Sequence, residues 1–86
     1  MAWRIEFDPA ATKELENLVR PVARRILRFL SERLAPLQNP RVIGEPLQGA
    51  RRGALWRYRV GDYRLIASLE DEAAKILIVR IGHRRE

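Results

Sequence analysis

The sequence predicts an α+β fold with one N-terminal strand, an α-helical hairpin, and then a three-strand antiparallel meander that packs on the helices. Three observations support this prediction: apolar and polar residues alternate at the start of the chain, a helical apolar period follows, and alternation returns in the last third. A chain of 86 residues suits a single domain, here residues 1–86, with a modest core.

The first strand leads directly into the first helix. In residues 3–7, apolar residues alternate with charged ones, which is the pattern of a short half-buried strand. Asp8 is suited to cap a helix and Pro9 to occupy its first turn. We therefore expect a helix over residues 9–18.

The second helix is expected over residues 21–35, with Pro21 at its start. Its apolar residues recur at helical spacing, and four arginines lie mostly off this apolar stripe. A short link between the two helices predicts an antiparallel hairpin. The stripe consists of Val22, Ile26, Phe29, Leu30 and Leu34, and the arginines are Arg24, Arg25, Arg28 and Arg33.

The segment between the helices and the last third of the chain has little periodicity. Residues 39–53 contain two prolines and three glycines, so we expect a loop of about fifteen residues there. A loop of that length is uncommon in a small domain and is often functional.

The last third of the chain predicts three strands, over residues 55–60, 63–69 and about 75–81. Gly61-Asp62 fits a two-residue type I′ or II′ turn between the first two. Side chains alternate between the two faces of a strand, so the turn determines which residues share a face. The face toward the helices is expected to hold Trp56, Tyr58, Val60, Tyr63, Leu65 and Ala67, completed by Leu77, Val79 and Ile81.

The opposite face of the meander is expected to be basic toward one end and apolar toward the other. Arg59 and Arg64 should lie directly opposite each other across the hairpin, where like charges destabilise a sheet. Such a pair indicates a bound anion, either a phosphate backbone or an acidic protein segment. The face carries Arg57, Arg59, Arg64, Arg80 and Arg84, together with Leu55, Ile66, Ile76 and Ile78.

The composition narrows the classes of function. Lys and Arg number 17 against 11 acidic residues, a net charge of +6 that favours acidic partners. With no cysteine and one histidine, neither a disulfide nor a zinc or iron site is expected, and no cofactor is indicated. No apolar run approaches the length that spans a bilayer, and the N-terminus lacks the apolar stretch of a signal peptide, so we expect a cytoplasmic protein that does not bind a membrane.

Four stretches carry a family resemblance: residues 5–11, residues 44–49, residues 56–65 with Gly-Asp-Tyr-Arg-Leu at 61–65, and residues 79–85 with Gly-His-Arg at 82–84. In these stretches the chain resembles toxins of the RelE/ParE superfamily, of the RelE type. The resemblance implies the same order of strand, helical hairpin and antiparallel meander. It further implies a ribosome-dependent endoribonuclease that cleaves mRNA in the A site without a metal, and a cognate RelB-like antitoxin that forms a hetero-oligomer with it.

The resemblance also implies which residues form the site. Arg64 matches the family arginine that contacts the scissile phosphate, Arg84 matches the arginine of the last motif, and Arg57 and Arg59 match two basic positions. The high pKa of arginine makes it a poor proton carrier, so these four are expected to bind phosphate and stabilise the transition state. A tyrosine that usually follows the last motif is absent from the sequence, which ends at Glu86.

The remaining candidate site residues are a histidine and three further arginines. His83 is the only side chain whose unperturbed pKa lies near neutrality, which makes it the candidate general acid or base. Strand alternation, however, places it on the face opposite Arg84. We expect Arg80, Arg51 and Arg52 to contribute RNA contacts.

Two other functions remain open on the sequence. A ParE-like toxin that inhibits gyrase shares the fold but generally lacks the arginine cluster. A catalytically weak toxin that only binds its antitoxin is favoured by the absent tyrosine. In each case we expect an acidic or apolar antitoxin segment over Ile66, Ile76, Ile78 and the arginines, or over the helices.

Overall fold

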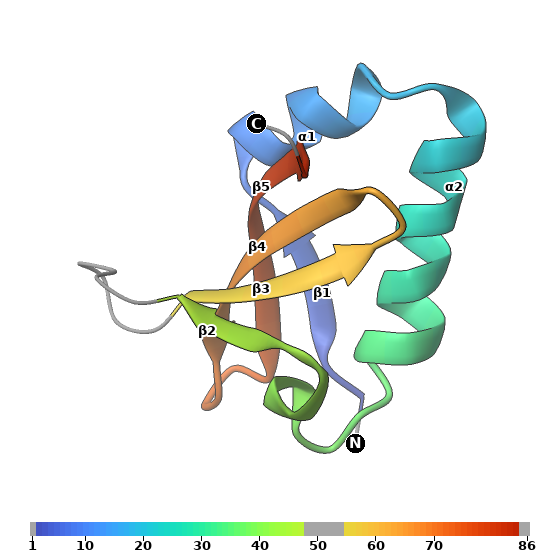
Figure 1. The fold of residues 1–86 in the computed structure, drawn as a ribbon. Coiled ribbons are helices and arrows are strands. Elements are labelled where there is room, and N and C mark those ends of the chain that lie inside the picture. Colours follow the sequence, from blue (N-terminus) through green and yellow to red (C-terminus); the bar gives the residue numbers. More distant parts are fainter. Residues whose placement is uncertain (1, 48–54, 85–86) are drawn as a thin grey trace.

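The computed structural model describes residues 2–47 and 55–84. The helices pack on one face of a five-stranded sheet with the strand order β1-β5-β4-β3-β2 (Figure 1). No helix within these two ranges is long and apolar enough to cross a membrane. The elements are β1 (Arg4–Phe7), α1 (Pro9–Glu16), α2 (Arg20–Arg28), the π-helix η1 (Phe29–Leu34), the 3₁₀ helix η2 (Pro40–Ile43), β2 (Glu45–Leu47), β3 (Leu55–Val60), β4 (Tyr63–Glu70) and β5 (Lys75–His83).

The predicted α+β class is confirmed, and the sheet is larger than the expected meander. β3, β4 and β5 form the antiparallel meander in the predicted order. β1 extends it by pairing in parallel with β5, from Arg4 opposite Lys75 to Phe7 opposite Ile78. β2 extends the other side by pairing with β3. A strand from the start of the chain therefore lies beside the strand at its end.

The helices lie close to their predicted positions. Asp8 caps α1 by accepting a hydrogen bond from the Ala10 N–H at 3.2 Å, and Pro9 occupies the first turn. α2 continues directly into η1, where the Ala35 N–H donates to the Leu30 carbonyl at 2.8 Å. The predicted apolar stripe faces the core: Ile26, Leu30 and Leu34 are buried, and Val22 and Phe29 are partly buried against them.

The prediction of a loop over residues 39–53 is wrong in its first part. Residues 40–43 form η2, and Glu45–Leu47 form β2. Pro46 argued against a strand, but β2 lies at the sheet edge, where a residue without an N–H is tolerated. Arg51 and Arg52 lie outside the described residues.

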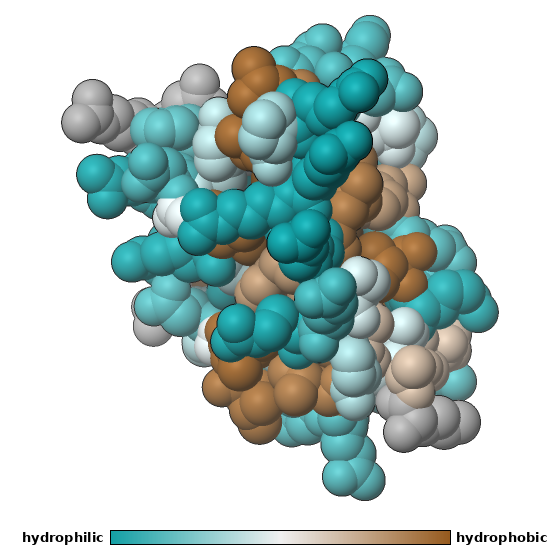
Figure 2. Space-filling model, turned by 90° about the vertical axis from the view of Figure 1, so that its right-hand side faces the viewer, coloured by the Kyte–Doolittle hydropathy of each residue, from teal (hydrophilic) through white to brown (hydrophobic). Residues whose placement is uncertain are grey.

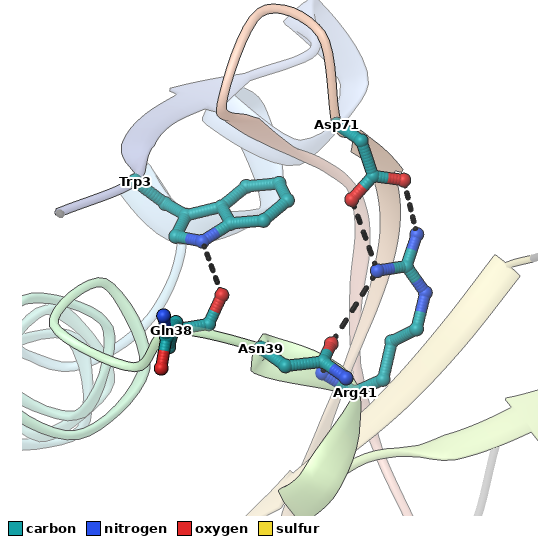
Figure 3. A network of polar contacts seen from close by, with 5 residues as sticks. All are labelled: Trp3, Gln38, Asn39, Arg41 and Asp71. Atoms are coloured by element: carbon teal, nitrogen blue, oxygen red, sulfur yellow. Dashed lines mark hydrogen bonds and ion pairs between the residues drawn. The ribbon is translucent and has the colours of Figure 1, made fainter.

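Polar contacts hold η2 between the start of the chain and the β4–β5 turn (Figure 3). The Arg41 guanidinium donates to Asn39 Oδ1 at 3.4 Å and to both carboxylate oxygens of Asp71 at 3.1 and 2.8 Å. The Trp3 indole N–H donates to the Gln38 carbonyl at 3.3 Å. The hydrogen bond from Arg41 lowers the pKa of Asp71, so this pair stabilises the fold at neutral pH and less as the pH falls through the carboxyl range.

The β3–β4 hairpin has the predicted register. Gly61 has a φ of +59° while Asp62 has no positive φ, which identifies a type II′ turn. Arg59 lies opposite Arg64, and the buried Tyr58 lies opposite the buried Leu65. The two-residue turn therefore fixes the alternation of both strands, as the sequence predicted.

β5 departs from the predicted alternation because it contains a β-bulge. Ile66 pairs with Arg80, but the next residue of β4, Ala67, pairs with Ile78, so Val79 has no partner in the ladder. Because of this extra residue, the alternation of side chains between the two faces is shifted by one residue from one side of the bulge to the other. The predicted faces are therefore wrong before the bulge and right after it: Ile76 and Ile78 are buried, Leu77 and Val79 are half-buried, and Ile81 is buried as expected.

Tyr58 is the largest of the fully buried side chains in the described core. Its hydroxyl donates to the Pro40 carbonyl at 3.0 Å, and its ring centroid lies 6.3 Å from that of Phe29. A Cβ built on Gly44 would lie 2.8 Å from a carbon of the Tyr58 ring. Glycine at position 44 thus allows the link between η2 and β2 to close over this ring.

Replacing Gly44 with alanine is expected to destabilise the fold by about 1–3 kcal/mol, because the added methyl group overlaps the Tyr58 ring. Chemical denaturation followed by circular dichroism measures this change. Val42→Ala is the control, since Val42 is 69% exposed in the same segment, and it should change the free energy of unfolding by less than about 0.5 kcal/mol. Equal stabilities for the two variants would contradict the close packing of Gly44.

Candidate functional site

A groove on the sheet face away from the helices brings together three of the five arginines predicted for that face. Its volume is about 340 Å³, and its walls come from β2, β3, β4 and β5. We call it the arginine groove. It is lined by Arg57, Arg64 and Arg80, by the apolar side chains Leu47 and Ile66, and by residues 81–83.

The direction of each groove arginine follows from strand alternation and from the bulge. Tyr58 and Leu65 are buried, so their chain neighbours Arg57 and Arg64 point to the other side of the sheet. With Ile78 in the core, unbroken alternation would turn residue 80 inward as well. The bulge at position 79 instead turns Arg80 outward, opposite Ile66. The irregularity in β5 thus completes the groove.

Carboxylates from neighbouring elements hold two of these arginines. Glu45 of β2 lies opposite Arg57 and accepts from its Nη2 at 3.0 Å. Glu14 of α1 accepts from Arg80 Nε at 3.0 Å. Such partly exposed ion pairs contribute little to stability. They do fix the direction of each side chain while leaving other guanidinium donors available to a ligand.

Glu14 also joins α1 to the end of β5. Its second oxygen accepts from the Ile81 N–H at 2.7 Å. β1 pairs with β5 only as far as Ile78, so the carboxylate satisfies a backbone group beyond the end of that pairing. One side chain therefore binds both the Arg80 guanidinium and the backbone beside it.

The other two predicted arginines, Arg84 and Arg59, lie next to the groove rather than in its wall. Arg84 follows β5, with its Nε 3.8 Å from Asp62 Oδ1, and its carbonyl accepts a hydrogen bond from the Arg64 guanidinium. Arg59 lies opposite Arg64 but lines a separate hollow together with Arg33. The five predicted arginines thus form one basic region, and Arg57, Arg64 and Arg80 are the three that line the groove.

His83 lies in the groove wall with its ring against an aromatic neighbour. Its ring centroid is 5.2 Å from that of Tyr63 at an interplanar angle of 85°, and the two residues are partners in the β4–β5 ladder. Gly82, not His83, is the partner of Arg64. The imidazole therefore shares its sheet face with Tyr63, while Arg64 points to the other face.

The buried phenol of Tyr58 does not titrate near neutral pH. Burial raises the pKa of Tyr58 to about 12, an effect that the nearby Arg41 charge partly opposes. The phenol also donates to a backbone carbonyl in the core, on the sheet face away from the groove. Tyr58 is therefore a structural residue, as the sequence predicted.

The raised pKa of Tyr58 predicts how stability depends on alkaline pH. An unfolded tyrosine titrates near about 10, so the free energy of unfolding should be fully retained below that pH and should fall as the pH rises through about 12. Denaturation curves across this range, with ultraviolet detection of tyrosinate, measure the effect. The Tyr58→Phe variant should lose this component of the pH dependence, and an unchanged dependence would contradict the assignment.

The groove offers phosphate-binding chemistry. Guanidinium groups bind phosphate oxygens in pairs through N–H donors, and preorganised donors stabilise charge that develops in a transition state. Within residues 2–47 and 55–84, no group of three or more acidic or histidine side chains is placed to hold a metal ion. The described groove thus combines guanidinium donors suited to an anion with apolar surface at Leu47 and Ile66.

Sequence reasoning missed three residues of this site: Leu47, Glu45 and Glu14. The first two lie in β2, a strand of only three residues with a proline at its centre, which gives no alternating pattern to detect. Nothing in the sequence indicates the contact from Glu14, because it depends on how α1 packs against β5. The structure also removes Ile76 and Ile78 from the predicted antitoxin-binding flank, since both are fully buried.

A comparison with protein-family models gives one match to nearly the whole chain. Residues 5–86 match the model described as "ParE toxin of type II toxin-antitoxin system, parDE". The matched range includes the helical hairpin and every strand that lines the arginine groove.

Comparisons with individual proteins agree with this match. Toxin RelG of Mycobacterium tuberculosis is 27% identical over 86 residues, which cover 100% of this chain and 95% of the relative. The mRNA interferase toxin RelE of Escherichia coli is 29% identical over 84 residues, which cover 98% of this chain and 85% of the relative. Among solved structures, the toxin–antitoxin complex RelBE2 of Mycobacterium tuberculosis contains a chain with a TM-score of 0.82 and 27% identity, and the match covers 98% of this chain and 100% of that one.

Proposed function

Since the chain belongs to the ParE toxin family of type II toxin–antitoxin systems, within the RelE/ParE superfamily, we propose that it is a ribosome-dependent endoribonuclease that cleaves mRNA in the A site. The observation that carries this proposal is the convergence of Arg57, Arg64 and Arg80 on one groove. A relative that is 29% identical over 84 residues is named an mRNA interferase, which supports the same activity.

The arginines supply the electrostatic part of the reaction. In RNA cleavage without a metal, the ribose 2′-hydroxyl attacks the adjacent phosphorus, its proton passes to a base, and the leaving 5′-oxygen receives a proton from an acid. Arg57 and Arg64 bind the phosphate and stabilise the extra negative charge of the phosphorane. Arg59 and Arg84, one on each side of the groove, extend the binding of the strand, and Arg80 contacts the RNA from β5.

His83 is our candidate for the general acid or base. It lies in the groove wall, and it is the only histidine in the chain. Imidazole exchanges protons near neutral pH, which arginine does not. The ring lies edge-on to Tyr63, on the sheet face opposite Arg64, so proton transfer in the groove requires this side chain to turn toward it.

The proposal includes a RelB-like antitoxin that forms a hetero-oligomer with this chain. The RelBE2 structure of Mycobacterium tuberculosis is a toxin–antitoxin complex, and this chain matches its whole toxin-like chain with a TM-score of 0.82. The exposed side chains of the groove face, including Ile66 but neither Ile76 nor Ile78, offer basic and apolar contacts to such a partner. Because its substrate is ribosome-bound mRNA, the protein acts in the cytoplasm.

An mRNA cleavage assay with purified ribosomes tests the proposal. The expected result is cleavage of a programmed message in the A site, with little cleavage of the same RNA in the absence of ribosomes. Cleavage should not require a free metal ion. It should therefore persist when the assembled ribosomal complex is first cross-linked and a chelator then removes the free divalent ions. Failure to cleave on ribosomes would contradict the proposed activity.

A second candidate function follows from the description of the matched family model, which names the ParE toxin. ParE-like toxins inhibit gyrase without nuclease chemistry, and they generally lack the arginine cluster that this chain carries. A supercoiling assay with purified gyrase separates the two functions. Inhibition of gyrase without mRNA cleavage would favour the ParE-like function, and neither activity would favour a toxin that only binds its antitoxin.

A further inference from the structure

The exposed side of α2 carries a second concentration of arginines, on the opposite side of the sheet from the arginine groove. We call Arg20, Arg24, Arg25 and Arg28 the α2 arginine row. All four side chains are exposed, and together with Pro21 they line a groove of about 470 Å³. Figure 2 looks onto this side of the molecule, where hydrophilic surface runs along the helix between hydrophobic patches.

The α2 arginine row has no acidic counterpart in the described structure. α2 contains no acidic residue, and none of the four arginines makes an ion pair with residues 2–47 or 55–84. This contrasts with Arg57 and Arg80 of the arginine groove, each of which is paired with a glutamate. All four guanidinium groups of the row are therefore unpaired within the described residues, whereas in the arginine groove only Arg64 makes no ion pair.

This arrangement is unfavourable for the helix itself. Arg20, Arg24 and Arg28 follow one another at i, i+4 spacing, about 6 Å apart along the axis, where like charges destabilise a helix. Arg20 also lies at the N-terminal end, which carries the positive end of the helix dipole. A bound anion would relieve both effects.

The chemistry of the row favours phosphate over a protein partner. The centre of a protein–protein interface is usually apolar and aromatic, but the row itself presents guanidinium groups and one proline. Guanidinium groups in a line suit the regularly spaced phosphates of a nucleic acid backbone. Contacts of this type position a protein without reading sequence.

The row and the arginine groove lie on opposite sides of the sheet. Ile26 and Leu30, from the buried side of α2 and from η1, pack on the core face of the sheet, and the groove arginines point to its other face. The core thus separates the two basic surfaces. We propose that the α2 arginine row binds the phosphate backbone of folded RNA while the arginine groove holds the strand to be cleaved; the identification of the nucleic acid as RNA rests on the proposed function.

A salt titration of RNA binding tests this proposal with matched variants. The test variant is Arg24→Gln with Arg28→Gln, since glutamine has nearly the same helix propensity as arginine. The control variant is Arg4→Gln with Lys13→Gln, which removes the same charge from exposed positions on β1 and α1. The probes are a fluorescent RNA hairpin, a short unstructured oligoribonucleotide and a polyglutamate peptide.

The expected result is that the test variant binds the hairpin more weakly than the control variant does. The slope of log Kobs against log salt should become less steep by about 2 in the test variant, one for each phosphate contact removed. Hairpin binding that is equal in the two variants, or absent in the wild-type protein, would overturn the proposal. Polyglutamate binding that depends on Arg24 and Arg28 while hairpin binding does not would assign the row to an acidic protein instead.

The ribosome assay keeps this result separate from the proposed function. If the wild-type protein does not cleave mRNA in the A site but binds the hairpin through the row, the proposed nuclease activity is contradicted. The proposal that the row binds RNA then still holds. If the wild-type protein cleaves mRNA in the A site but its hairpin binding does not depend on the row, the nuclease activity is supported and the RNA-binding role of the row is overturned.

Discussion

Replacing Arg64 with alanine is expected to lower the rate of ribosome-dependent mRNA cleavage by about 10²–10³-fold, because one preorganised donor to the phosphorane is lost. Arg64 lies in the groove wall, two residues before Ile66, which pairs with both Arg57 and Arg80. It also lies opposite Arg59 across the hairpin. Single-turnover cleavage on purified ribosomes measures the effect, and growth after induction without an antitoxin gives an independent readout.

The same substitution should leave the fold intact. The Arg64 side chain points away from the core, and its one hydrogen bond in the described structure is to the Arg84 carbonyl. Its loss should cost less than about 1 kcal/mol of stability. Arg4→Ala is the control for activity, since Arg4 lies on β1, away from the groove. Unfolding of Arg64→Ala would contradict the placement of this side chain, and full activity would contradict its role.

Replacing Ile78 with alanine is expected to destabilise the protein by about 2–5 kcal/mol, because it leaves a cavity in a packed core. Ile78 is fully buried and lies opposite Ala67, a residue too small to fill the space. In a domain of this size the midpoint of thermal unfolding should fall by about 4–8 °C for each kcal/mol. Differential scanning calorimetry measures both quantities.

Val79→Ala is the matched control for Ile78→Ala. Val79 is the unpaired residue of the bulge and is only half-buried, so the same kind of truncation should cost less than about 1 kcal/mol. The comparison tests the register of β5 directly, since an unbulged strand would give the opposite order. A larger loss for Val79→Ala than for Ile78→Ala would show that the bulge lies elsewhere.

The sequence predicts most accurately where local chemistry determines the structure. The two-residue turn at Gly61-Asp62 fixes the pairing of β3 with β4, so the directions of Arg57 and Arg64 could be predicted. Asp8 and Pro9 likewise fix the start of α1. These features depend on residues that are neighbours in the chain.

The features that the sequence does not predict depend on residues far apart in the chain. The bulge at Val79 lets Ile78 and Ile81, which are three residues apart, both face the core, and no local signal marks it. The parallel pairing of β1 with β5 and the contact from Glu14 to Arg80 likewise arise only when the whole sheet has formed. Candidate site residues were predicted where the hairpin carries them and missed where α1 and β2 supply them.

The parallel pairing of β1 with β5 has a consequence for the timing of folding during synthesis. β1 is made first, yet its strand partner in the described sheet is made last, and β5 also contributes Ile76 and Ile78 to the core. Contacts between distant parts of a chain form slowly and only after both parts exist. A nascent chain that lacks β5 therefore has neither a closed sheet nor a complete arginine groove, so both form only after β5 has been synthesised.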